Sequence, residues 1–102
     1  PLVGVFGRSN VYVELLLHLL RDEDVDNRAL IDLAGTFHVP IVATNGVRFA
    51  DAAERPLFDV LTCIREHTTL EGAGRRLARN SEHFMKNGAT MERLFADARM
   101  IS

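Results

Sequence analysis

Residues 39–49 read Val-Pro-Ile-Val-Ala-Thr-Asn-Gly-Val-Arg-Phe, a short apolar run that ends in polar, turn-prone residues. Buried parallel strands are typically unbroken apolar runs, and α/β proteins place their binding and catalytic groups at the carboxyl ends of such strands. We therefore expect Thr44, Asn45, Gly46 and Arg48 to mark what remains of a functional site. These side chains are nevertheless poorly equipped for catalysis.

The segments before this stretch predict a strand and a helix. Residues 11–17 are rich in β-branched and aromatic side chains, which favours a strand, although periodicity does not decide how the chain continues to Leu20. Residues 28–38 place apolar side chains on one helical face, and Asp24 or Asp26 is expected to cap that helix. A strand, a helix and a second strand in this order form a βαβ unit with parallel strands. The predicted fold class is therefore α/β, with an incomplete strand–helix arrangement.

The second half of the chain predicts helices. One helix is expected over residues 56–67, because Pro56 suits a first helical position. Residues 68–80 contain two glycines and predict an irregular connection, and residues 81–86 predict a helical turn that Asn87-Gly88 ends. Thr90 is the expected cap of a last short helix. Three apolar residues of that helix should face inward: Met91, Leu94 and Phe95.

Apolar side chains from the predicted helices and the 39–49 strand are expected to build the core. Phe49 and Phe58 should lock the end of that strand to the next helix. The predicted core residues are Leu30, Ile31, Leu33, Phe37, Ile41, Val42, Leu57, Leu61 and Ile64.

Composition sets limits on the function. The chain has 102 residues, of which 47% are hydrophobic and 25% charged, so it fits one small globular domain or a piece of a larger one. The net charge of −2 predicts no general affinity for nucleic acid. Cys63 is the sole cysteine, which excludes an internal disulfide and weakly favours a reducing, cytoplasmic location. The apolar stretches are too short to span a bilayer, so no membrane partner is expected.

Few side chains suggest chemistry of their own. The four histidines form no closely spaced metal motif, and solvated or helix-capping roles are the favoured interpretation. Cys63 could form a Cys–His nucleophile with His67, one helical turn later. The preferred interpretation is that Cys63 is a small buried hydrophobic residue. Arg75, Arg76 and Arg79 form a basic cluster beside flexible glycines, and this cluster suggests a phosphate or DNA contact. A surface ion-pair patch with nearby glutamates explains the cluster equally well.

The order of four segments resembles the alpha subunits of bacterial C-family DNA polymerase III. The resemblance covers most of residues 11–97, and its individual motifs are modest while their collinear order is specific. Residues 56–65 together with Ala73-Gly74-Arg75-Arg76-Leu77 look more like the error-prone, damage-tolerant branch. The four segments are Val11-Tyr12-Val13-Glu14-Leu15, Pro40-Ile41-Val42-Ala43-Thr44-Asn45, Asp59-Val60-Leu61-Thr62-Cys63-Ile64-Arg65 and Met91-Glu92-Arg93-Leu94-Phe95-Ala96-Asp97.

This resemblance implies a position within the family's amino-terminal polymerase-and-histidinol-phosphatase (PHP) domain, a TIM-like strand–helix barrel. Residues 1–67 would form its later βαβα part, and residues 68–102 would be an irregular connection with short helices leading out of it. The family's early metal ligands would precede Pro1, and its catalytic aspartates would follow Ser102. Magnesium is expected for the parent polymerase and no cofactor for this fragment.

One family metal motif falls inside the chain, the Asn-Asp-x-His pattern that follows the Ala-Thr segment. Asn45 matches its Asn, whereas Gly46 replaces the Asp and Arg48 replaces the His. Glycine offers no side-chain ligand, and a guanidinium stays protonated and repels a cation. The resemblance therefore implies a degenerate metal site with no catalytic residues, in which Arg48 would hold neighbouring carboxylates together in place of the metal.

Three functions stay open. The leading interpretation is a structural piece of an error-prone DNA-directed DNA polymerase, a nucleotidyltransferase of DNA replication and DNA repair after DNA damage. Its partners would be the rest of the parent and, through it, DNA. The second is a phosphoesterase or pyrophosphatase remnant in which His18, Asp51 and Glu54 assemble a site with a partner chain. This site would require a dimer, because one chain offers too few ligands; a homodimer of the fragment is one such partner arrangement. The third is a DNA- or protein-binding module that acts through the arginine cluster.

Overall fold

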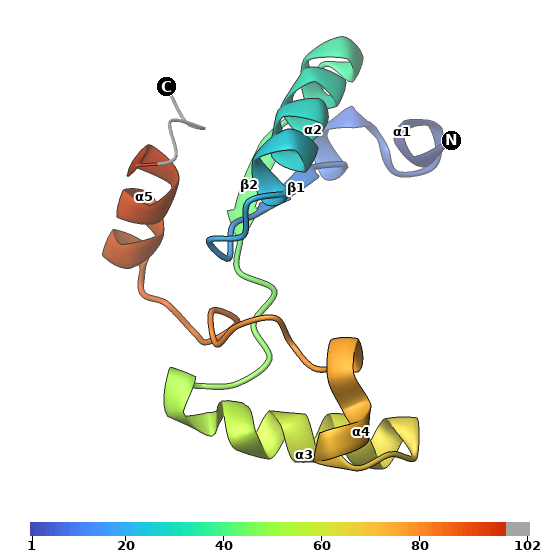
Figure 1. Cartoon of the computed structure of the whole chain (residues 1–102). Coiled ribbons are helices and arrows are strands. Elements are labelled where there is room, and N and C mark those ends of the chain that lie inside the picture. Colours follow the sequence, from blue (N-terminus) through green and yellow to red (C-terminus); the bar gives the residue numbers. More distant parts are fainter. Residues whose placement is uncertain (98–102) are drawn as a thin grey trace. The chain divides into compact units, whose positions relative to one another are not determined.

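The computed structural model describes residues 1–97 and has α/β structure, as expected (Figure 1). Two compact units are present, one formed by Pro1–Thr44 with the segment from Lys86 onward, the other by Asn45–Met85. The predicted domain boundary at residue 67 concerns the parent protein and stays a prediction. The last residues of the predicted segment 68–102, residues 98–102, lie outside the described part of the chain. The helices and strands are α1 (Leu2–Phe6), β1 (Val13–Leu16), α2 (Glu23–Phe37), β2 (Ile41–Thr44), α3 (Arg55–Glu66), α4 (Leu70–Ala73) and α5 (Gly88–Asp97).

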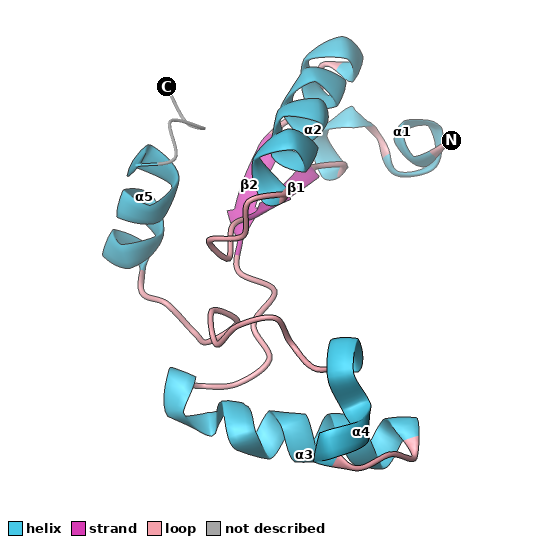
Figure 2. Ribbon diagram, viewed as in Figure 1, coloured by secondary structure: helices cyan, strands magenta, loops and turns pink. Residues whose placement is uncertain are grey.

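Strands β1 and β2 form a two-stranded parallel sheet, which confirms the predicted βαβ unit (Figure 2). Val13 is paired with Ile41 and Leu16 with Thr44. Helix α2 connects the strands and packs against β1, while α5 packs against β2. Asn27 on α2 donates from its side-chain amide to the carbonyl of Leu16 (2.7 Å), which fixes the helix to the end of β1.

Helix α2 begins earlier than predicted. It starts at Glu23, so Asp24 and Asp26 lie inside its first turn and the predicted caps are wrong. The Glu23 carboxylate instead accepts hydrogen bonds from the backbone N–H groups of His18 (2.6 Å) and Leu20 (3.1 Å). Acidic side chains in a first turn are stabilised by the positive end of the helix dipole, which explains why the acidic run is compatible with helix.

The core of the first unit is smaller than predicted. Leu15, Leu17 and Phe95 form its buried cluster, and Phe95 is only 1% exposed. Met91 and Leu94 pack against this cluster, so the prediction that the last helix turns these side chains inward is confirmed. Leu30 and Ile31 also pack there and are partly buried.

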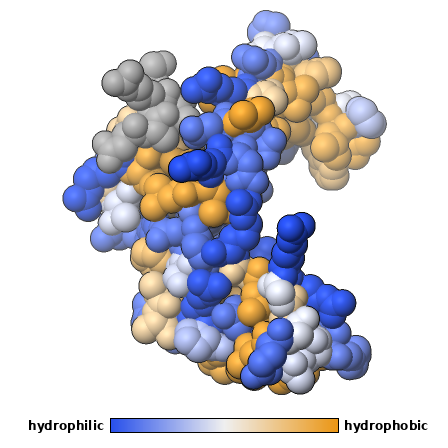
Figure 3. Space-filling view, viewed as in Figure 1, coloured by the Kyte–Doolittle hydropathy of each residue, from blue (hydrophilic) through white to orange (hydrophobic). Residues whose placement is uncertain are grey.

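Seven predicted core residues are exposed. A two-stranded sheet offers little area for helices to cover, so these side chains stay largely at the surface of residues 1–97. Apolar atoms consequently reach the surface in each unit (Figure 3). The seven are Leu33, Phe37, Ile41, Val42, Leu57, Leu61 and Ile64.

Helix α3 confirms the predicted helix of the second unit. Pro56 lies in its first turn, and His67 ends it in a left-handed conformation. Phe58 on this helix lies against Phe49, with 5.7 Å between ring centroids, as predicted. The connection expected over residues 68–80 is more regular than predicted, because it contains α4 and a 3-10 turn at Gly74–Arg76. The side chain of Thr69 caps α4 by accepting from Gly72 N–H, which explains why a glycine-rich segment begins with helix.

Within the described residues, no helix has the length and apolar character needed to cross a membrane.

The approach to α5 also differs from the prediction. Residues 82–83 form a turn, but Phe84 is extended and pairs with Phe49 in an isolated parallel bridge. Asn87 does not end a helix. Its side-chain oxygen accepts from the backbone N–H of Thr90 (2.8 Å), so Asn87, not Thr90, caps α5.

We expect Asn87→Ala to lower the free energy of unfolding by about 1 kcal/mol, because the helix loses its capping acceptor. Thr90→Ala is the matched control and should cost less, since that hydroxyl is not the cap. Urea unfolding followed by circular dichroism at 222 nm measures both. Equal losses in the two variants would contradict the assignment.

Candidate functional site

The candidate site begins where β2 ends, at Thr44. The next residues, Asn45 to Phe49, run beside the returning segment Glu82–Met85 and bond to it through main-chain groups. Arg48 N–H donates to the carbonyl of His83 (2.8 Å), and Met85 N–H donates to the carbonyl of Phe49 (3.1 Å). We call these two paired segments the loop clamp. It belongs entirely to the second unit.

Asn45 is the buried centre of the loop clamp, with 5% of its surface exposed. Its side-chain nitrogen donates to the carbonyls of Glu82 (2.8 Å) and Phe84 (2.5 Å). These two bonds join the residue that follows β2 to the returning segment. Asn45 is therefore a structural residue here.

Gly46 and Arg48 also contribute to the loop clamp rather than to a charged centre. Gly46 has a left-handed backbone (φ 49°), which glycine adopts without strain, and its carbonyl lies 3.0 Å from Nδ1 of His83. The Arg48 guanidinium lies 5.6 Å from the centroid of the Phe58 ring, a cation–π contact. Among residues 1–97 Arg48 forms no ion pair, so these residues do not show the expected bridging of carboxylates.

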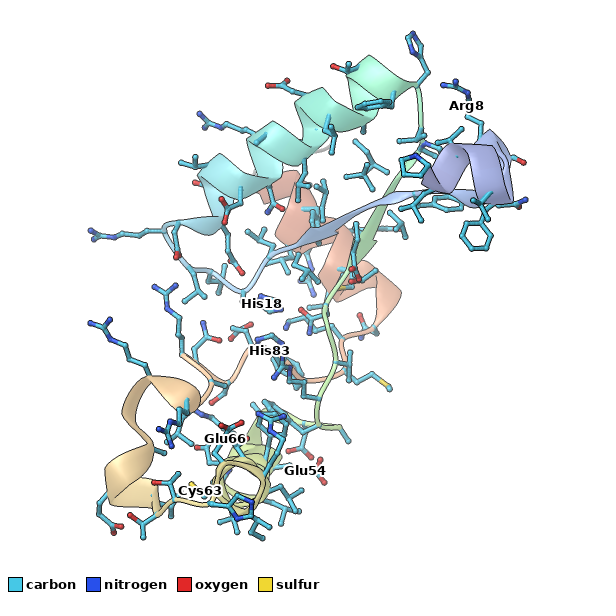
Figure 4. The ribbon with its side chains drawn as sticks, turned by 90° about the vertical axis from the view of Figure 1, so that its right-hand side faces the viewer. Arg8, His18, Glu54, Cys63, Glu66 and His83 are labelled. Atoms are coloured by element: carbon cyan, nitrogen blue, oxygen red, sulfur yellow. The ribbon has the colours of Figure 1, made fainter. Side chains whose placement is uncertain are left out.

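Sequence reasoning missed the returning half of the loop clamp. The sequence predicts a helical turn at His83 and Phe84, and no local pattern places them beside residues 37 or 35 positions earlier. Figure 4 labels His83 in the second unit and His18 in the first. Both segments are also too short for their hydrophobic pattern to predict that they pair.

Two of the four histidines lie at helix ends, as the capping interpretation predicts. His38 and His67 take left-handed conformations at the ends of α2 and α3, where their N–H groups bond to carbonyls of the last helical turn. His18 is buried and lies 2.7 Å from the Glu23 carboxylate through Nδ1. This pair joins the end of β1 to the start of α2.

The residues proposed for a phosphoesterase site have local structural roles. Asp51 accepts from Ala53 N–H (2.9 Å), and Glu54 accepts from Ala50 N–H (2.8 Å). His18 lies in the other unit, paired with Glu23. Within the part of the chain that the structure describes, no three His, Cys, Asp or Glu side chains group closely enough to hold a metal ion.

Cys63 is buried in α3, as is its neighbour Thr62. Its backbone carbonyl accepts from Thr68 N–H (3.0 Å), which helps to end the helix. His67 is exposed at that end. This environment fits the small hydrophobic role preferred from the sequence.

The arginine cluster lies after α4. Arg75 and Arg79 line a cavity of about 450 Å³, and Arg76, on the same 3-10 turn as Arg75, is exposed but does not line it. The structure thus brings two of the three predicted arginines to one cavity.

Comparison with known proteins identifies relatives of one kind. The chain is 56% identical over 68 residues to a protein named error-prone DNA polymerase from Bradyrhizobium diazoefficiens, a match that covers 67% of this chain and 6% of the relative. It is 41% identical over 87 residues to an error-prone DNA polymerase of Rhodopseudomonas palustris, covering 85% of this chain and 8% of the relative. The chain is related to error-prone DNA polymerases.

The similarity to error-prone DNA polymerases extends across most of the chain. Error-prone DNA polymerase 2 of Agrobacterium fabrum is 35% identical over 91 residues, which covers 89% of this chain and 8% of the relative. The chain thus spans 6 to 8% of the length of these relatives. No protein-family model matches it.

Proposed function

We propose that this chain is a structural part of an error-prone DNA polymerase, a nucleotidyltransferase that acts in DNA replication and repair in the cytoplasm. The observation that carries the proposal is the 56% identity over 68 residues to a relative of that name. The finer assignment, to the PHP portion of a C-family alpha subunit, is supported by the order of the segments quoted above.

The contacts of the loop clamp support a scaffold role. Asn45 uses its amide nitrogen on two backbone carbonyls, and Arg48 stacks on Phe58. A guanidinium cannot bind a divalent cation, and within residues 1–97 no three His, Cys, Asp or Glu side chains group closely enough to hold one. The described residues therefore do not fit the magnesium expected for nucleotide transfer, and we propose that other parts of such a polymerase hold that ion.

The exposed apolar side chains support packing against a larger protein. Leu57, Leu61 and Ile64 leave one side of α3 exposed among the described residues. Burying such a face against neighbouring polymerase segments contributes roughly 25 cal/mol per Å² of apolar area. A homodimer that covers the same residues stays a prediction.

The test replaces the matching stretch of the Bradyrhizobium diazoefficiens relative with this chain's residues and measures extension of a primed DNA template. We expect an extension rate comparable to that of the unmodified protein, because a scaffold needs shape and not reactive groups. The same chimera should show no manganese-dependent hydrolysis of a chromogenic phosphodiester above background.

Two results would contradict the proposal. A soluble chimera without extension activity would show that this chain does not fit the polymerase. Manganese-dependent hydrolysis that disappears on Asn45→Ala, while circular dichroism stays unchanged, would instead establish the phosphoesterase function.

A further inference from the structure

Two arginines of the second unit flank one cavity. Arg75 and Arg79 line its volume of about 450 Å³, which is in the size range of small-ligand sites, and both side chains are exposed. Among residues 1–97, Arg75 makes no hydrogen bond or ion pair with another side chain or carbonyl group. Its guanidinium is thus available to a ligand in the cavity.

The backbone that carries these arginines is fixed to α3. Arg55 on that helix donates from Nη2 to the carbonyl of Ala78 (2.6 Å), the residue before Arg79. The Arg55 side chain is itself oriented by Asp59, one helical turn away, with 3.5 Å between Nε and Oδ2. A site whose backbone is held before binding loses less conformational entropy when the ligand arrives.

Gly74 sets the direction in which Arg75 leaves α4. Its backbone has φ 51° and ψ −121°, a conformation that residues with a Cβ rarely adopt, and its carbonyl accepts from Leu77 N–H (3.3 Å). The resulting 3-10 turn places Arg75 at the cavity. It leaves Arg76, the next residue, outside the lining.

We propose that Arg75 and Arg79 hold a phosphodiester group of a DNA strand in this cavity. Guanidinium groups bind phosphate oxygens through paired N–H donors, a geometry that a single ammonium does not offer. The choice of DNA over an acidic peptide rests on the proposed function, because the relatives are named DNA polymerases. Arg76 contributes only general positive charge.

The experiment measures fluorescence anisotropy of a labelled single-stranded oligonucleotide with the 102-residue chain over a series of salt concentrations. We expect Arg75→Gln and Arg79→Gln each to weaken affinity about tenfold. Each should also reduce the slope of log affinity against log salt by about 0.7, the value for one lost phosphate contact on a single strand.

Arg76→Gln is the matched control, since it removes the same charge one residue away. We expect a smaller loss of affinity than for Arg75→Gln. Arg28→Gln, an exposed substitution on α2, should leave binding unchanged. Circular dichroism of each variant excludes unfolding as the cause.

Four outcomes would overturn the inference: no binding of the wild-type chain at low salt, equal losses in the Arg75 and Arg76 variants, an acidic peptide of matched charge bound as tightly through the same arginines, and a free deoxynucleoside triphosphate that competes as strongly as the oligonucleotide. Failure here is separate from failure of the proposed function, because primer extension by the chimera is measured without these substitutions.

Discussion

Replacing Phe95 with alanine should lower the free energy of unfolding of the first unit by about 3 to 5 kcal/mol, the usual cost of truncating a fully buried phenylalanine. Phe95 is 1% exposed and packs against Leu15 and Leu17. This contact joins α5 to the end of β1. Within residues 1–97 the cluster has three buried members surrounded by partly buried hydrophobic side chains, so removing the ring takes away a large share of the buried apolar contact in this core.

Phe6→Ala is the matched control for this variant, because the same ring is removed from an exposed position on α1. We expect it to cost far less. Urea unfolding at 222 nm gives both free energies, and amide hydrogen exchange of β1 residues shows whether the loss is local to the core. If the two phenylalanine variants lost equal stability, the placement of α5 on this core would be wrong.

Asn45→Asp should destabilise the second unit by about 2 to 4 kcal/mol, because the buried side chain at position 45 loses the amide group that donates to two partly buried carbonyls. The new carboxylate also lies against the carbonyl oxygens of Glu82 and Phe84, and two acceptors repel each other. Aspartate has almost the same shape as asparagine, so lost packing contributes little.

This substitution separates a structural role from metal binding. A metal ligand at position 45 would gain affinity for divalent cations on becoming a carboxylate, and added Mn²⁺ would then restore stability. We expect no such restoration. Asn10→Asp is the control, since Asn10 is exposed and donates to the carbonyl of Phe6 in the same way (2.8 Å). The measurement is thermal unfolding with and without Mn²⁺, and a large rise in Tm on adding Mn²⁺ to Asn45→Asp would contradict the scaffold role.

The elements that local patterns determine could be predicted from the sequence. Pro56 marked the first turn of α3, and the apolar run ending at Thr44 gave β2 and its parallel pairing with β1. Element ends were less accurate. The start of α2 was missed because the Glu23 side chain bonds backward to the chain before the helix, a contact that propensity does not encode.

Burial was predicted least well. Helical periodicity identifies the apolar side of α3, including Leu57, Leu61 and Ile64, but not whether another element covers it. The candidate site shows the same limit. Asn45, Gly46 and Arg48 were found from their place after a strand, whereas the hydrogen bonds described above that join them to the returning segment each use a backbone group on at least one side. Because nearly all residue types carry the same backbone groups, such bonds are difficult to predict from the sequence.

The loop clamp joins the two ends of the chain segment that lies between β2 and α5. Main-chain hydrogen bonds from Arg48 to His83 and from Met85 to Phe49 connect these ends, so the residues between them form a closed loop. The entropic cost of closing a loop rises only with the logarithm of its length, by about 0.6 kcal/mol each time the length doubles. Residues added inside this loop, away from the hydrogen-bonded ends of its helices, would therefore be tolerated, whereas removing one residue from either segment of the loop clamp would shift every pair that follows it.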